Sequence, residues 1–322
     1  MLKPLVEEFC EGEILFDTKD FLKTLGDYVI VLSSPGMDLF TLDVKGLYPS
    51  MNTDYMEDAV MEMLDLLTDF CESKKIMIAK MVQFSINNSI VHYRDDWYVG
   101  ILGLTTGNSD SVPLANLFVR WVIKLFHEFN KNEWSNTIAL LKRFIDDLFG
   151  GWKGTRRQFD RFVNALNSFG KKYGIQFDSK DVQYGDSVNF LDVTVYKKKQ
   201  NQICTRLYSK PTDAHRYLHR KSYHPQHTFK SVPFSQMRRA RLICSEDDVL
   251  NDTLLEMNKY FENCGYDKKY LLETNDKVLR LNRAEMLTNE VKTQIDDAND
   301  SVTFVLPYSE NNKDISSPAK LA

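Results

Sequence analysis

Two adjacent aspartates interrupt an apolar run near the middle of the chain, and this feature limits most strongly what the sequence can fold into. The run is Phe-Ile-Asp-Asp-Leu-Phe at residues 144–149, within a short-strand pattern over 137–152 that ends in Gly150-Gly151. Acids among bulky apolar side chains are costly unless they bind something. Because neighbouring residues of a strand point to opposite faces, Asp146 and Asp147 reach one site only if they lie on a turn. We therefore expect a hairpin with an acidic turn.

A third acid closes an earlier strand pattern, since Asp43 follows Phe40-Thr-Leu in the stretch 38–44. Two Mg²⁺ ions can stabilise the charge on the entering and leaving oxygens when a 3′-hydroxyl displaces pyrophosphate. A few carboxylates plus substrate phosphates suffice to hold such ions. Asp43, Asp146 and Asp147 are the candidate catalytic metal ligands. An Asp-Asp pair alone is also common at surface turns, so the assignment depends on the motifs around it.

The charge distribution points to a phosphate-binding segment. The 322-residue chain has a net charge of −4, which by itself is unfavourable for gripping nucleic acid. Twelve basic residues nevertheless lie between 197 and 241, with Asp213 as the only acid among them. This segment could hold a nucleic-acid backbone, although a solvated charged face remains an alternative.

The periodicity of apolar residues predicts the order of the elements. A helix over 54–70 with Asp54 as N-cap, a hairpin of 89–93 and 97–102, and a buried helix over 113–126 precede the acidic hairpin. After it we expect a helix over 157–173, strands at 175–177, 188–196 and 202–208, and helices beyond Ser231, including 254–261 and 277–287. The order indicates an α+β sheet domain followed by a helical subdomain.

These residues resemble, in their order, the motif series of reverse transcriptases. The matching stretches are Leu42-Asp-Val-Lys-Gly-Leu-Tyr-Pro-Ser, the Gly-rich loop and helix at 103–117, Phe144-Ile-Asp-Asp, Gly174-Ile-Gln-Phe-Asp-Ser-Lys and Val188-Asn-Phe-Leu-Asp-Val. Tyr208-Ser-Lys-Pro-Thr-Asp, Tyr217-Leu-His, Ser222-Tyr-His-Pro and the run 231–245 are more specifically similar to Penelope-like retroelements. The resemblance spans roughly residues 38–285.

The resemblance implies an α+β fold with a reverse-transcriptase-type palm, an antiparallel sheet with packed helices, followed by a mainly helical thumb. The domains implied are a residual fingers segment at 1–37, the palm at 38–208, a basic thumb at 209–290 and a flexible tail at 291–322. The activity implied is that of an RNA-directed DNA polymerase.

The resemblance also assigns roles to individual residues. Asp43, Asp146 and Asp147 would hold the metals, and Lys180 would protonate the leaving pyrophosphate. Tyr48 would lie under the sugar of the incoming nucleotide and exclude a 2′-hydroxyl. Thr106, Gly107 and Asn108 would approach the nucleotide or template, although this loop departs from the Gly-Ser-Pro type of the family. Candidate primer-grip and thumb residues are Phe190, Leu191, Lys210, Arg216, Arg220, Arg238, Arg239 and Arg241.

The implied cofactors are two Mg²⁺ ions, with Mn²⁺ as an alternative and no organic cofactor. The implied partners are an RNA template, a DNA primer and dNTPs, in an intracellular, nuclear setting without membrane insertion or secretion. Four histidines (His215, His219, His224 and His227) with Cys204 or Cys244 raise the alternative of a zinc site, but five isolated cysteines provide no four-ligand spacing.

Two departures from the family pattern leave activity open. Only 42 residues precede Asp43, and they are acidic overall, so we expect truncated fingers; a separate segment could supply them. No GIY-YIG pair follows residue 250, so no endonuclease is expected in this chain. The alternatives are an inactive remnant that only binds nucleic acid and a metal-dependent phosphohydrolase that uses the same acids.

Overall fold

The structure is a computed structural model that describes residues 2–178 and 181–288. The chain divides into two compact units, Met1–Tyr208 and Ser209–Ala322. Each unit has its own buried core, so the two are described separately below. Among the described residues, no helix is long and apolar enough to cross a membrane.

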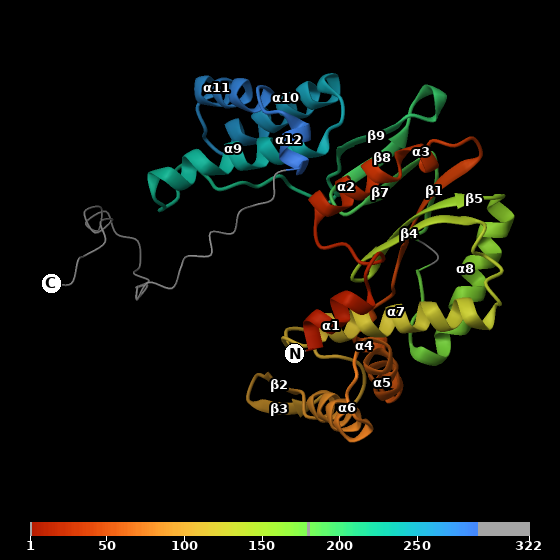
Figure 1. Cartoon of the computed structure of the whole chain (residues 1–322). Coiled ribbons are helices and arrows are strands. Elements are labelled where there is room, and N and C mark those ends of the chain that lie inside the picture. The colour runs from red at the N-terminus through yellow and green to blue at the C-terminus, as the bar shows by residue number, and fades with distance from the viewer. Residues whose placement is uncertain (1, 179–180, 289–322) are drawn as a thin grey trace. The chain divides into compact units, whose positions relative to one another are not determined.

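A four-stranded antiparallel sheet forms the centre of the first unit (Figure 1). Its strand order is β4 (Ile138–Phe144), β5 (Asp147–Lys153), β1 (Met37–Asp43) and β6 (Gln183–Gly185). The register between β1 and β5 runs from Met37 opposite Lys153 to Asp43 opposite Asp147. The last residue of β1 and the first of β5 therefore meet at one end of the sheet.

Strand β1 is covered on both faces, which explains why it is buried along most of its length. Phe40 faces helix α8 (Arg156–Gly170), with its ring 5.0 Å from that of Phe159. On the opposite face, Phe149 of β5 contacts Phe21 of α2 (Thr18–Asp27) and Phe190 of β7 at 4.9 and 5.6 Å. Strands buried on both faces lose the simple alternation of half-exposed strands.

Helices and two smaller sheets complete the first unit. The remaining helices are α1 (Leu2–Phe9), α3 (Val29–Leu32), α4 (Leu47–Ser50), α5 (Met56–Leu67), α6 (Glu72–Asn87) and α7 (Ser111–Phe129), with 3₁₀ turns at Thr53–Tyr55, Lys171–Tyr173 and Lys199–Asn201. Strands β2 (Ile90–Tyr93) and β3 (Asp96–Val99) form an exposed hairpin. Strands β7 (Ser187–Phe190), β8 (Val193–Lys197) and β9 (Ile203–Leu207) form a three-stranded sheet.

The second unit is helical in its described part. It contains α9 (Gln226–Ile243), α10 (Asp247–Asn263), α11 (Lys268–Leu279) and α12 (Arg283–Thr288). Before α9, the segment from Ser209 has no helix and packs on α10 by ring stacking, His215 on Tyr260 at 4.0 Å and Tyr217 on Phe261 at 4.2 Å. The fold is thus α+β, with an antiparallel sheet and packed helices followed by a helical part, which confirms the predicted fold class.

Several local predictions are corrected. Asp54 is not an N-cap; it lies inside the 3₁₀ turn Thr53–Tyr55. The N-cap of this turn is Asn52, whose side chain accepts a hydrogen bond from the Asp54 amide. The stretch 175–177 is not a strand, because only Phe177 makes a bridge, to Val44. The stretch 188–196 is two strands, and the helix expected over 277–287 is interrupted between α11 and α12.

The Gly-Gly pair after the acidic turn allows neighbouring side chains to pack closely on the sheet. Gly150 and Gly151 lie inside β5. A Cβ atom on Gly150 would come within 2.3 Å of the Phe40 ring, and one on Gly151 within 2.6 Å of Leu32. Both glycines therefore allow the sheet to be packed closely on its two faces.

Gly174 provides a test of this account of the packing. Its φ is +73°, and a Cβ there would lie 1.8 Å from the Ser50 carbonyl oxygen, whereas a Cβ on Gly26 of α2 meets nothing within 4 Å. We expect Gly174→Ala to lower the free energy of unfolding by about 2–3 kcal/mol, through left-handed strain and collision. Urea unfolding followed by circular dichroism would measure it.

Gly26→Ala is the matched control. An alanine in a helix restricts the unfolded chain without a steric cost, so we expect a gain of about 0.5–1 kcal/mol. Equal effects of the two substitutions would contradict the packing described for Gly174.

Candidate active site

The three predicted metal ligands lie at one end of the four-stranded sheet. Asp43 ends β1 and is paired in register with Asp147, which begins β5. Ile145 and Asp146 form the two-residue turn between β4 and β5, and the Val44 amide donates to the Asp146 carbonyl oxygen at 3.0 Å. The pair therefore lies at a turn, the arrangement that allows adjacent acids to share one site.

The electrostatics of Asp43 show that other acids surround it. Partial burial raises the pKa of its carboxyl group above the usual 3.8, and the nearby charges of Asp146, Asp181 and Asp178 raise it further. A hydrogen bond with the Asp147 side chain opposes this shift. Asp178 is held close by its amide, which donates to the Asp43 carbonyl at 2.9 Å. Sequence reasoning missed Asp178 and Asp181, although the former lies in a motif it had singled out.

The donor set is chemically suited to Mg²⁺, which prefers oxygen ligands. Among the described residues, however, no group of three or more His, Cys, Asp or Glu side chains already has the spacing of a metal site. Mg²⁺ commonly uses one or two protein carboxylates and completes its octahedron with water and substrate phosphates. The carboxylates fit an ion held jointly with a triphosphate better than an ion enclosed by protein alone.

Tyr48 lies beside these acids. It is in the short helix α4 and is partly buried; burial and the Asp146 charge raise the pKa of its hydroxyl. Its carbonyl oxygen accepts a hydrogen bond from the Leu104 amide at 2.8 Å. Gly103, with φ +73°, permits this contact, because a Cβ there would lie 2.2 Å from the same oxygen. Gly103 is thus a residue of the site that sequence reasoning did not single out.

The candidate template loop is exposed and connected to the β2–β3 hairpin. Thr106, Gly107 and Asn108 are all exposed to solvent. Gly107 has φ +103° and open space around its Cα, so its requirement is conformational. The Asn108 side chain donates to the Ser89 hydroxyl at 3.1 Å, which joins the loop to the hairpin base.

The candidate primer-grip residues differ in exposure. Phe190 is 2% exposed and packs against Phe21 at 4.6 Å, so its ring anchors the β7–β8 hairpin and does not face a ligand. Leu191 forms the turn with φ +54° and is half-buried. A gripping contact in this conformation would therefore come from the turn itself.

The candidate thumb cations belong mostly to the second unit's surface. Lys210, Arg216, Arg220, Arg238 and Arg239 are exposed. Arg220 is partly engaged, since it donates to Gln226 at 2.9 Å and lies over the Phe229 ring. Arg241 is structural: it donates to the Leu281 carbonyl at 2.9 Å and pairs with Asp247 at 2.6 Å. Helix α9 carries no acid, whereas α10 carries five.

The remaining candidates are Lys180 and the histidines of the zinc alternative. Lys180 lies outside the described residues. The histidines considered for zinc are accounted for in part by aromatic contacts, His215 on Tyr260 and His224 near Phe229.

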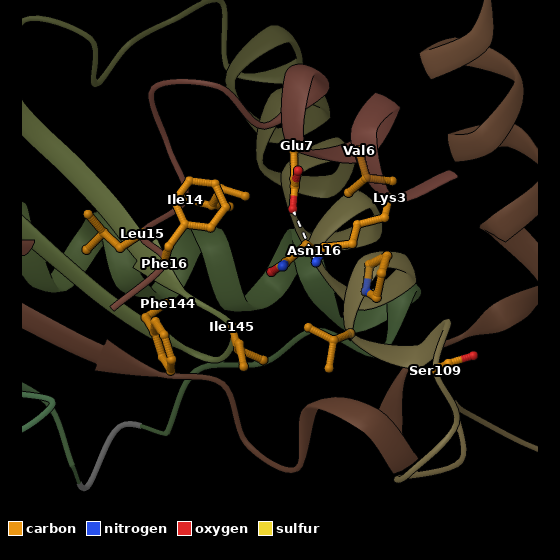
Figure 2. A pocket seen from close by; sticks show the side chains of 12 residues that line it. Lys3, Val6, Glu7, Ile14, Leu15, Phe16, Ser109, Asn116, Phe144 and Ile145 are labelled. Carbon is orange, nitrogen blue, oxygen red and sulfur yellow. Dashed lines mark ion pairs between the residues drawn. The ribbon is translucent and has the colours of Figure 1, made fainter. Parts of the chain in front are cut away.

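A cavity of about 340 Å³ adjoins the acidic turn (Figure 2). Its wall includes Phe144 from β4, Ile145 from the turn, Asn116 from α7, and residues 14–16. Lys3 and Glu7 of α1 form an ion pair at 3.8 Å in its lining. The lining is mainly apolar. The N-terminal segment, α7 and the turn each contribute residues to it.

Comparison with solved structures identifies the fold. The chain is similar to telomerase from Candida albicans in complex with a TWJ fragment of telomeric RNA, with a TM-score of 0.58, 12% identity, and coverage of 86% of this chain and 50% of that one. Telomerase from Candida tropicalis in complex with a TWJ fragment gives a TM-score of 0.52, 11% identity, and coverage of 89% and 55%. The chain spans about half the length of these telomerases. It therefore has a reverse-transcriptase-like fold.

The sequence comparisons add one partial match. Residues 216–276 match the family model of the animal helix-turn-helix domain, which covers α9 and α10 and most of α11. No curated protein matches the sequence significantly.

The raised pKa of Asp43 generates a test of the acidic cluster. A carboxyl whose pKa is raised in the folded state contributes stability that is present below its unfolded pKa and is lost as the pH rises through its folded value. We therefore expect Asp43→Asn to raise the Tm at pH 7 without divalent cations, because it removes a partly buried charge and its repulsion from Asp146, Asp181 and Asp178. The gain should disappear below about pH 3.8.

Scanning calorimetry with and without Mg²⁺ would measure both effects. The variant should also lose the stabilisation that Mg²⁺ gives the original chain. Asp69→Asn, at an exposed acid between α5 and α6, is the control and should change neither quantity. A lower Tm for Asp43→Asn at pH 7 would contradict the cluster.

Proposed function

We propose that this chain contains the palm and thumb of an RNA-directed DNA polymerase of the Penelope-like type, which extends a DNA primer on an RNA template. The observation that carries the proposal is the convergence of Asp43, Asp146 and Asp147 at one end of the sheet of a reverse-transcriptase-like fold. Two acids on a hairpin turn and one on the adjacent strand suit nucleotidyl transfer.

The protein groups have distinct tasks in this proposal. Asp43, Asp146 and Asp147 hold two Mg²⁺ ions, or Mn²⁺, which stabilise charge on the triphosphate when bound. Tyr48, whose hydroxyl lies within the field of Asp146, would exclude a ribose 2′-hydroxyl and select dNTPs. Thr106, Gly107 and Asn108 would guide the template, and Lys180 would supply a proton to the leaving group.

The primer–template would be held by backbone contacts. The turn at Leu191 would support the primer end. The exposed cations of the second unit would contact phosphates without regard to sequence. The helix-turn-helix match supports a nucleic-acid role for this unit. An enzyme that copies RNA into DNA would act inside the cell, in the nucleus for an element that inserts there.

Primer extension tests the proposal. A labelled DNA primer annealed to RNA should be extended with dNTPs and Mg²⁺ by the full chain. Asp146→Asn should reduce the rate by more than the ~100-fold that loss of an outer-shell partner costs, because it removes a direct ligand. Asp69→Asn should leave the rate unchanged. Extension that persists in Asp146→Asn would contradict the proposed site.

A second candidate is an inactive remnant that only binds nucleic acid. The exposed cations of the second unit support it, because they could bind a phosphate backbone without any metal site. It would be supported if the chain bound RNA–DNA hybrid in fluorescence anisotropy but never extended the primer.

Under either proposal, Arg238→Gln should lower the slope of log binding constant against log salt concentration by about one. Lys259→Gln, on the acidic helix α10, should leave this slope unchanged.

A further inference from the structure

A buried arginine two residues before the turn bonds to the turn and to helix α7. Arg143, the penultimate residue of β4, is 0% exposed. Its Nη1 atom donates to the Ile145 carbonyl at 2.9 Å and to the Asn116 side-chain oxygen at 2.8 Å. Its Nη2 atom donates to the Asn116 carbonyl at 3.0 Å. One guanidinium thus ties the acidic turn to helix α7.

The charge of Arg143 is balanced by a residue far away in sequence. Glu13 is 7% exposed and accepts a hydrogen bond from the Arg143 Nε atom at 3.0 Å. The other oxygen of Glu13 accepts from Arg120 of α7, also at 3.0 Å. The backbone reinforces the contact, because the Arg143 amide donates to the Glu13 carbonyl and the Leu15 amide donates to the Arg143 carbonyl. The N-terminal segment is therefore paired with β4 beside the turn.

The turn needs such support. Ile145 has φ +55°, a left-handed conformation that is unfavourable for a β-branched residue. Backbone of this kind persists only where the surroundings over-determine it. A charged donor bound to a carbonyl in a buried setting makes a strong hydrogen bond. Arg143 supplies that bond to the carbonyl of the strained residue, directly before Asp146.

We propose that Arg143 is a positioning residue: it holds Ile145 in the left-handed conformation and so orients Asp146. Glu13 neutralises the charge of Arg143. The effect on catalysis rests on the proposed function, whereas the effect on the conformation of the turn does not. This role of Arg143 also gives the stretch 13–15 a task beside the metal site. Arg143 touches neither substrate nor metal and acts through the turn.

The chain offers a matched pair of substitutions. Arg143→Lys keeps the positive charge near Glu13 but loses the planar fork that reaches both Asn116 and Ile145. Arg120→Lys makes the same chemical change on the other oxygen of Glu13, but the Arg120 side chain bonds to Glu13 and not to the carbonyl of Ile145. Ile145→Gly removes the need for support, because glycine adopts positive φ at little cost.

Hydrogen exchange detected by mass spectrometry gives a readout that does not depend on activity. In Arg143→Lys we expect at least tenfold faster exchange in peptides covering 144–148 and Val44, whose amide is bonded to the Asp146 carbonyl. Exchange in α8 should not change. Arg120→Lys should leave the turn as in the original chain. Unchanged exchange in Arg143→Lys, or an equal rise in both variants, would overturn the proposal.

Kinetics provide the second readout where primer extension is observed. Arg143→Lys should lower kcat at least tenfold with little change in KM for the primer–template. Adding Ile145→Gly should recover a substantial part of that loss, because the turn no longer needs the bond. Additive losses in the double variant would overturn the inference. If no extension occurs even in the original chain, the proposed function fails, and the exchange result still decides the role of Arg143.

Discussion

The antiparallel pairing of β1 with β5 is the contact on which the rest of the first unit depends. It places Asp43 opposite Asp147, and the short turn before β5 adds Asp146 to the same end of the sheet. The pairing is kept in register by side chains on both faces. Phe40 fills the space left by Gly150 on one side, while Phe149, Phe21 and Phe190 pack on the other.

Repulsion among the acids is the opposing constraint. Partial burial raises the pKa of Asp43, and the nearby charges of Asp146, Asp181 and Asp178 raise it further, so the metal-free site is electrostatically unfavourable. A rigid frame is needed to keep these carboxylates together. In our account the frame includes the buried Glu13–Arg143–Asn116 contacts as well as the sheet. Cations that neutralise the cluster would then stabilise the fold as well as serve the proposed chemistry.

The sequence predicted those features that depend on local pattern. The strand ending in Asp43, the acidic hairpin and the helix after it were recognised because periodicity and residue chemistry agreed over short stretches. Helix α6 was missed, because the exposed apolar residues Met77, Met81 and Phe84 obscure the buried stripe of Ile78, Ala79, Val82 and Ile86 in the sequence pattern. The roles of Glu13 and Gly150 could not be predicted, because their partners, Arg143 and Phe40, lie more than 100 residues away.

We propose that the three carboxylates at the end of β1 and the start of β5 (Asp43, Asp146 and Asp147) hold two catalytic metal ions. Electron paramagnetic resonance with Mn²⁺ tests it most directly, in the presence of an RNA–DNA primer–template and a non-incorporable nucleotide. We expect two bound ions with magnetic coupling between them, lost in both Asp43→Asn and Asp146→Asn and retained in Asp69→Asn. Binding that is absent in the original chain, or unchanged in both aspartate variants, would contradict it.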